Sequence, residues 1–268
     1  MRKAPRTETM IESVRFKTYD GVDLAANLYL PDTQEWSPGI IVCHGFGSGK
    51  DNYAAFGTMA AAAGYAVLVP DLRGHGESGG ELDGNMFNDV AASLQYLHTR
   101  PEVNPMGLAI RGTSMGGWLA LHTAGYLRDI SPVIAYCPAS ETTMQVLVEE
   151  VSMVQRGHAS PLVPPKPPRV NVNSLLQLLY KVDVLKAARR IQPRPLLLVH
   201  CEGDEVVPAH LTRRLYDSVA EPKTLWLLPG GDHHFAQHDP ETDSRVLGWL
   251  DLVRPHTENL KFEEPPED

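Results

Sequence analysis

The sequence predicts an α/β fold in which helices cover both faces of a mostly parallel central sheet. Short, almost uninterrupted apolar runs recur along the chain, and each is followed by a helix-like segment or by a loop and then a helix. Strands that are apolar along their whole length are buried on both faces, and the intervening helices provide the crossovers that parallel strands need. Two alternating segments near the N-terminus additionally predict an antiparallel hairpin at the start of the sheet.

The hairpin is the first element in the chain. Residues 12–19 and 22–30 alternate apolar and polar side chains around Asp20-Gly21, a dipeptide that favours tight hairpin turns. The buried strands that follow are expected at 39–43, 66–70, 107–111, 132–137, 196–201 and 224–228, with later helices near 208–219 and 240–253. Because active sites in such sheets gather at the carboxyl ends of the strands, residues just after each run are the first candidates for function.

The interval 138–192 breaks this alternation. It holds an amphipathic stretch, a cluster of five prolines between Pro161 and Pro168, and a second apolar helix-like piece. This is too long for a plain connection, so we interpret it as a helical cap inserted into one core formed by 12–137 and 193–255. A helical excursion that only packs against the core is the alternative. Residues 1–11 and 256–268 are expected to be flexible ends.

Composition narrows the classes of partner. A net charge of −9 over 268 residues argues against nucleic acid or an anionic membrane, since both reward basic patches. The N-terminal residues lack the apolar region of a signal peptide, and no stretch is long enough to span a bilayer. Three cysteines, each at the end of an apolar run, are typical of reduced thiols; a Cys137–Cys201 bridge is the alternative if their strands are neighbours. We therefore expect a cytoplasmic protein; its oligomeric state stays open, with a homodimer as one alternative.

The segment Leu108 to Ala120 carries the strongest chemical signal. It contains G-x-S-x-G as Gly112-Thr-Ser114-Met-Gly116, with an apolar strand before it and a helix-forming stretch after it. A serine forced into this turn takes a strained backbone conformation that exposes its hydroxyl at the sheet edge, and the small flanking glycines let neighbouring backbone approach. The alternative is a tight turn in which Ser114 only caps the helix. Ser114 is the predicted nucleophile.

A serine nucleophile needs a base, and the base needs an orienting group. Asp204 follows the 196–201 strand in a Gly-containing turn, and His233 follows the last strand in a Gly-rich loop, which completes the chain order Ser, Asp, His. The rival orienting carboxylates are Glu141, Glu202 and Glu205. The adjacent His234 competes with His233 as the base. His233, His234 and His238 do not have the spacing of a metal site, so no metal is predicted.

The oxyanion hole is expected to use two backbone amides, because such donors stabilise charge that appears only in the transition state. One is the amide of Met115, and the other is that of Phe46 in His44-Gly-Phe-Gly47, directly after the 39–43 strand. Two phosphate-loop readings fail. Residues 45–51 lack the required glycine and the hydroxyl residue after Lys50, and residues 74–79 are crowded by acidic side chains with no helix opening there.

Taken together, these motifs resemble the α/β-hydrolase superfamily over about residues 12 to 253. The resemblance rests on 44–47, 71–78 (Asp-Leu-Arg-Gly-His-Gly-Glu-Ser), 112–116, 203–204 and 231–233 in this order. The opening 20–31 is similar to dienelactone-hydrolase-like, acyl-peptidase-like and cinnamoyl/feruloyl-esterase-like members, and the insertion at 138–192 resembles the cap of the last group. The resemblance implies that 71–78 shapes the wall of the site and has no catalytic role. The doubled histidine and the proline-dense cap depart from the pattern, so the substrate does not carry over.

The resulting hypothesis is a serine hydrolase that cleaves carboxylic esters through Ser114, His233 and Asp204 and an acyl-enzyme intermediate, without a cofactor. Its partner is a small-molecule ester or acyl substrate. Apolar residues of the cap, such as Met144 and Leu147, favour an apolar acyl or aromatic group, unless they only pack the cap onto the core. Two alternatives keep the same scaffold: an acyltransferase or thioesterase acting on a biosynthetic acyl thioester, and a non-catalytic small-molecule binder.

Overall fold

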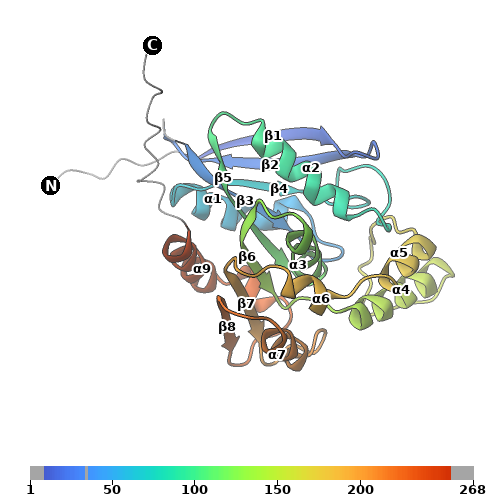
Figure 1. The fold of residues 1–268 in the computed structure, drawn as a ribbon. Helices are drawn as coiled ribbons and strands as arrows, with labels where there is room; N and C mark the ends of the chain where they lie inside the picture. The colour runs from blue at the N-terminus through green and yellow to red at the C-terminus, as the bar shows by residue number, and fades with distance from the viewer. Residues whose placement is uncertain (1–8, 34–35, 255–268) are drawn as a thin grey trace, which may run out of the picture.

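The computed structural model describes residues 9–33 and 36–254, and within them an eight-stranded sheet forms the centre of the molecule (Figure 1). The strand order is β1-β2-β4-β3-β5-β6-β7-β8. β1 (Met10–Lys17) and β2 (Asp23–Leu30) form the predicted antiparallel hairpin, with Lys17 opposite Asp23. β2 is also antiparallel to β4 (Ala66–Pro70), and the neighbours from β4 to β8 are all parallel. The predicted fold class is therefore confirmed. The other strands are β3 (Ser37–Cys43), β5 (Val103–Thr113), β6 (Ile130–Tyr136), β7 (Leu196–Cys201) and β8 (Lys223–Leu228).

Five strands begin earlier than the sequence pattern indicated: β3, β6 and β8 by one or two residues, β1 by two and β5 by four. β1 starts at Met10, so residues 10 and 11, which were assigned to the flexible N-terminal segment, pair with β2 instead. β5 starts at Val103 rather than at 107, and its first part contains exposed side chains and an irregular register against β3. Met10, Ile11, Pro105 and Met106 are exposed whereas Val103 is buried, so no continuous run of buried apolar side chains marks these residues. Residues 1–8 and 255–268, most of the two predicted flexible ends, lie outside the described residues.

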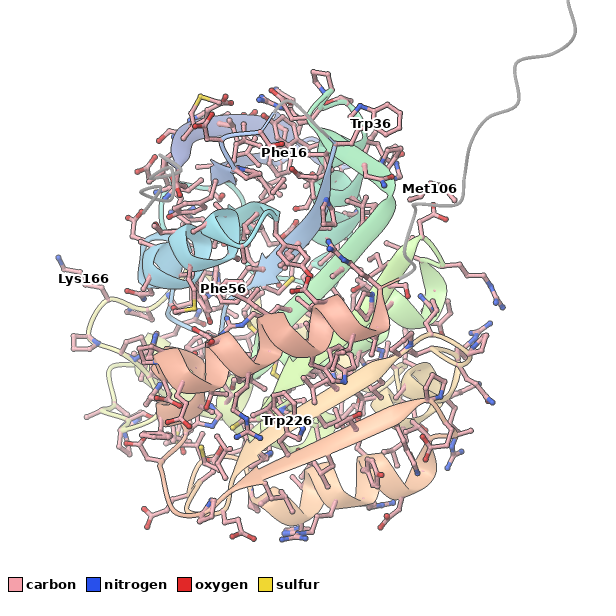
Figure 2. All side chains as sticks on the ribbon, turned by 90° about the vertical axis from the view of Figure 1, so that its left-hand side faces the viewer. Phe16, Trp36, Phe56, Met106, Lys166 and Trp226 are labelled. Atoms are coloured by element: carbon pink, nitrogen blue, oxygen red, sulfur yellow. The ribbon has the colours of Figure 1, made fainter. Side chains whose placement is uncertain are left out.

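Two helical layers cover the sheet, because successive strand residues point to opposite faces. Ile40 and Val42 pack on one side with α1 (Ala54–Ala62) and α9 (Pro240–Val253). Figure 2 shows α9 crossing in front of the sheet, between Phe56 of α1 and Trp226 of β8. The opposite side is covered by α2 (Phe87–His98), α3 (Met115–Tyr126), α6 (Val184–Arg189) and α7 (Ala209–Ser218). Within the described ranges, no helix combines the length and apolar character needed to cross a membrane.

The expected cap segment leaves the sheet after β6. α4 (Glu141–Gln155) and α5 (Val172–Leu179) pack against each other beside the sheet, whereas α6 packs on α3 (Figure 1). Ser140 begins α4 with a reciprocal capping box to Thr143. The segment between α4 and α5 is held to the loop after β4, since the Arg169 amide donates to the Gly74 carbonyl at 3.0 Å and the Leu82 amide donates to the Arg169 carbonyl at 2.7 Å.

The loops after β3 and β4 are locked together by His44, which is fully buried. Its Nε2 accepts the amide hydrogen of Leu72 at 2.9 Å, so its Nδ1 carries the proton and donates to the Gly45 carbonyl at 2.8 Å. Burial lowers the pKa of His44 to about 4. Asp71 adds a second link, because its carboxylate accepts the amide hydrogens of Lys50 and Glu77. The 71–78 segment thus braces the loop at the end of β3.

The buried, neutral His44 predicts acid sensitivity. Between its ordinary pKa near 6.5 and its folded pKa of about 4, the unfolded chain binds a proton that the folded chain does not. The free energy of unfolding should therefore fall as the pH is lowered from 7 to 4, by up to about 3 kcal/mol from this group. In urea titrations across this range, we expect His44→Asn to be less stable at pH 7 but to lose less on acidification than the wild type. Parallel pH curves for the two proteins would contradict this role.

Candidate active site

Ser114 lies between the end of β5 and the first turn of α3, in a backbone conformation with φ 54° and ψ −118°. A positive φ is unfavourable for a residue other than glycine and persists only where the surroundings enforce it. Here the surroundings are tight: a Cβ on Gly112 would collide with the Gly116 carbonyl, and a Cβ on Gly116 would collide with the Cys43 carbonyl. The two glycines therefore allow the backbone contacts that hold the turn of Ser114.

Ser114 lines a cavity of about 510 Å³ together with His233. Three parts of the chain form its wall: the loop after β3, the expected cap segment, and the loops that follow β7 and β8. The lining residues are Gly45–Ser48, Asn52, Ala139, Thr142–Met144, Val146, Leu147, Pro161, Leu162, Pro164, Val206, Val207, His234, Gln237 and His238. The cavity thus lies at the carboxyl ends of the parallel strands, where the sequence placed the candidate residues.

Asp204 and His233 are in direct contact. Asp204 Oδ2 lies 2.7 Å from His233 Nδ1, and both residues are only 6% exposed. The other carboxylate oxygen, Oδ1, accepts the amide hydrogens of Val206 and Val207 at 2.9 and 2.8 Å. Burial acts to raise the pKa of Asp204, but hydrogen bonds from His200, His233 and Val207 outweigh it and hold the pKa far below its usual range. An ionised Asp204 fixes the proton of His233 on Nδ1 and leaves Nε2 as an acceptor.

His200 is a partner of Asp204 that the sequence reading missed. It lies on β7, fully buried, with its Nε2 3.4 Å from Asp204 Oδ2. Its Nδ1 is 2.7 Å from the Thr212 hydroxyl and its Nε2 is 2.8 Å from the Val207 carbonyl. A histidine inside the otherwise apolar run Leu196 to Cys201 is the signal that could have revealed it, because a buried polar side chain must find partners.

The rival carboxylates make other contacts. Glu202 pairs with Arg213 at 2.8 Å, and Glu205 is exposed. Glu141 accepts hydrogen bonds from Trp118 Nε1 at 2.9 Å and the Val184 amide at 2.8 Å, and contacts His122 Nε2 at 3.0 Å. Glu141 therefore joins the start of α4, helix α3 and the start of α6.

The second histidine of the pair is held differently. His234 Nδ1 lies 2.9 Å from Gln237 Nε2, and no carboxylate contacts its ring in the described part of the chain. The two imidazole rings meet edge to face, with centroids 5.4 Å apart. His233 is thus the histidine held by Asp204.

The predicted oxyanion-hole residues flank Ser114. Met115 is the first residue of α3, so its amide has no acceptor within the helix. Phe46 lies in the loop after β3 and lines the cavity. This loop approaches the serine closely, since a Cβ on the neighbouring Gly45 would lie 3.5 Å from Ser114 Cβ. Gly47, with φ +72°, packs against Pro164 of the expected cap segment, so this segment contacts the loop after β3.

A second missed residue, Arg111, connects the serine strand to the histidine loop. It is fully buried on β5, and its guanidinium lies 4.3 Å from the ring centres of both Phe56 and Tyr136. Its Nη2 donates to Asp243 of α9 at 2.9 Å and to the carbonyl of Gln237 at 3.2 Å, in the short helix α8 (Phe235–His238). The one charged residue in the run Leu108 to Thr113 was the available signal.

Potential metal ligands among the described residues gather at one point. Cys137, His200 and Asp204 bring ligand atoms within 4.8 Å of one another. However, the oxygens of Asp204 and both nitrogens of His200 already have the hydrogen-bond partners described above. A metal ion would have to displace those bonds. All three cysteines of the chain are buried free thiols.

The sequence is similar to known proteins over much of its length. A family model described as serine aminopeptidase, S33 (Hydrolase_4) matches residues 35–178, more than half of the chain. An uncharacterized protein of Mycobacterium tuberculosis is 29% identical over 243 residues, covering 89% of this chain and 76% of that protein. The quorum-quenching protein AidA of Acinetobacter baumannii is 34% identical over 134 residues, covering 48% of this chain and 44% of its own length.

Among solved structures, that of Est1E from Butyrivibrio proteoclasticus with bound ferulic acid has a TM-score of 0.73 at 21% identity, covering 90% of this chain and 98% of Est1E. At this identity the likeness concerns the fold. It agrees with the parallel sheet, the antiparallel start and the surrounding helices described above. The chain belongs to the Hydrolase_4 family and has the α/β-hydrolase fold.

Proposed function

We propose that this hydrolase-family protein cleaves carboxylic esters by serine chemistry. One observation supports the proposal above all others: the imidazole of His233 is bonded to the buried Asp204 and lines the same cavity as Ser114, which has a strained backbone. A nucleophile and a base that line one cavity, with an orienting carboxylate bonded to the base, are the groups that acyl transfer requires.

In the proposed mechanism, Ser114 Oγ attacks the acyl carbon while its proton moves to His233 Nε2. The oxygen of the tetrahedral intermediate becomes negatively charged and receives hydrogen bonds from the amides of Phe46 and Met115. The intermediate then collapses, His233 protonates the departing alcohol, and the acyl group remains on Ser114. Water, deprotonated by His233, attacks the acyl-enzyme and releases the acid. Asp204 holds the Nδ1–H tautomer and stabilises the imidazolium in each half-reaction.

The lining of the cavity supports a small ester with an apolar acyl or aromatic group. Met144 and Leu147 come from α4, and Leu162 comes from the proline-rich segment between α4 and α5. A cavity of about 510 Å³ accommodates a small molecule rather than a folded protein segment. The free thiols of the chain support a cytoplasmic location, which we also propose.

Ser114→Ala tests the nucleophile. The variant keeps the fold but has no hydroxyl to form an acyl-enzyme, so kcat/KM for an aryl butyrate should fall by about 10³-fold or more. Circular dichroism and thermal unfolding should match the wild type. Retention of near-full turnover by a folded Ser114→Ala protein would remove the mechanism. With an alcohol or thiol added to the wild type, acyl transfer exceeding hydrolysis would instead identify an acyltransferase.

Asp204→Asn tests the orienting carboxylate. An amide removes the negative charge and stabilises the wrong tautomer of His233, so kcat should drop by about 10³- to 10⁴-fold with little change in KM. Glu202→Gln is the matched control, since this exposed carboxylate follows the same strand and pairs only with Arg213 among the described residues. Steady-state kinetics of both variants decide the assignment. Equal losses in the two variants would show that Asp204 has no special role.

A further inference from the structure

The cavity beside Ser114 is lined by two kinds of side chain. The side chains from α4 and the proline-rich segment are mostly apolar. Beside Phe46, the loop after β3, the turn Lys50–Tyr53 and the region of α8 supply polar lining residues, which are Ser48, Asn52, His234, Gln237 and His238. The proposed mechanism uses none of these polar groups. A cavity with a few fixed polar groups facing an otherwise apolar space is typical of a site that orients its ligand.

Among these polar groups, His234 has the best-defined hydrogen-bond state. Its Nδ1 lies 2.9 Å from Gln237 Nε2, an amide nitrogen that can only donate. Nδ1 must therefore be the acceptor, and in the neutral ring the proton is on Nε2. His234 thus carries an N–H donor on the ring atom away from Gln237.

Gln237 is itself fixed by a hydrogen bond from a buried tyrosine. The Tyr53 hydroxyl donates to Gln237 Oε1 at 3.2 Å, and these two residues are 1% and 7% exposed. The backbone is fixed as well, because Asp232 Oδ1 accepts the amide hydrogens of His234 and Phe235 at 2.9 and 3.0 Å. A chain of bonds from the buried Tyr53 therefore sets the tautomer of a ring at the cavity wall. His234 is exposed, and water could satisfy either of its nitrogens, but this chain of bonds gives the ring one tautomer.

We propose that His234 determines substrate specificity by donating a hydrogen bond from Nε2 to an acceptor oxygen on the substrate. The favoured substrates are then esters whose apolar body also carries an ether, hydroxyl or carbonyl oxygen outside the scissile group. The apolar side chains from the cap segment contact the hydrocarbon part, and His234 binds the oxygen. This inference rests on the proposed ester hydrolysis at Ser114 and adds the class of ester.

The test compares esters that differ by one acceptor oxygen. One pair is 4-nitrophenyl 3-phenylpropanoate and 4-nitrophenyl 3-(4-methoxyphenyl)propanoate, which places the oxygen on the acyl side. The other is benzyl butyrate and 4-methoxybenzyl butyrate, which places it on the alcohol side. The readout is the ratio of kcat/KM within each pair. A ratio is insensitive to a general loss of activity, so a merely structural effect would not change it.

For the wild type we expect a three- to tenfold preference for the methoxy ester in one of the two pairs, the effect of one hydrogen bond to a neutral group. His234→Phe should bring this ratio to about one, and Gln237→Leu should lower it, because Nδ1 is then free to take the proton. His98→Phe is the matched control: this exposed histidine ends α2, does not line the cavity, and should leave the ratio unchanged.

A ratio near one in both pairs for the wild type, or a ratio that survives His234→Phe, would overturn the assignment of His234 while leaving ester hydrolysis intact. Failure of the proposed function has a different signature. In that case neither ester of a pair is turned over by the wild type above the level of Ser114→Ala. The two results are thus distinguishable in one set of measurements.

Discussion

The hydrogen bond between Asp204 and His233 joins two loops that lie 29 residues apart in the chain. It forms because β7 and β8 are parallel neighbours, so that their carboxyl ends bring the following loops to the same edge of the sheet. The strand β5 delivers Ser114 to this edge as well. The parallel arrangement of β5, β6, β7 and β8 therefore brings Ser114 and His233 to one cavity, with Asp204 bonded to His233 beside it.

The segment that follows His233 is also held by a residue of the sheet. Arg111 on β5 binds the carbonyl of Gln237 in α8 and the carboxylate of Asp243 in α9. Removing the partner of a buried charge costs about 3–5 kcal/mol of stability. Breaking the contact between Arg111 and Asp243 should therefore destabilise the protein strongly. Because Arg111 is three residues before Ser114, the strand that ends at the predicted nucleophile also anchors the helix that follows His233. On the other side of the cavity, Glu141 ties the start of α4 to α3.

Periodicity predicted the hairpin and the buried strands because those features depend on which side chains are apolar, as the alternation of residues 12–19 and the run 39–43 show. Motif spacing singled out Ser114, Asp204 and His233, since the turn geometry of Ser114 needs glycines at fixed distances. The extra length of β5 escaped because Val103–Gly107 pairs through its backbone while several of its side chains are exposed. Pairing between neighbouring strands is a tertiary property that a local pattern does not report.

The buried polar contacts escaped for the same reason. Arg111 and His200 stand in apolar runs, which marks them as unusual, but their partners lie in other elements. Asp243 and Gln237 are far along the chain from Arg111, and Thr212 lies in the helix that follows the strand of His200. The choice between His233 and His234 likewise depends on which ring faces Asp204, and adjacent residues differ only in the direction of their side chains. The sequence identified both histidines as candidates, and the contact with Asp204 distinguishes His233 from His234.

The proposed ester cleavage depends on Ser114 acting as a nucleophile that His233 activates. The most direct measurement is covalent labelling of the folded wild-type protein with a fluorophosphonate, followed by intact mass spectrometry and peptide mapping. We expect one adduct per chain, located on the peptide that contains Ser114, with a labelling rate that falls sharply in His233→Ala. An unlabelled protein, an adduct on a different serine, or a rate unchanged in His233→Ala would contradict it.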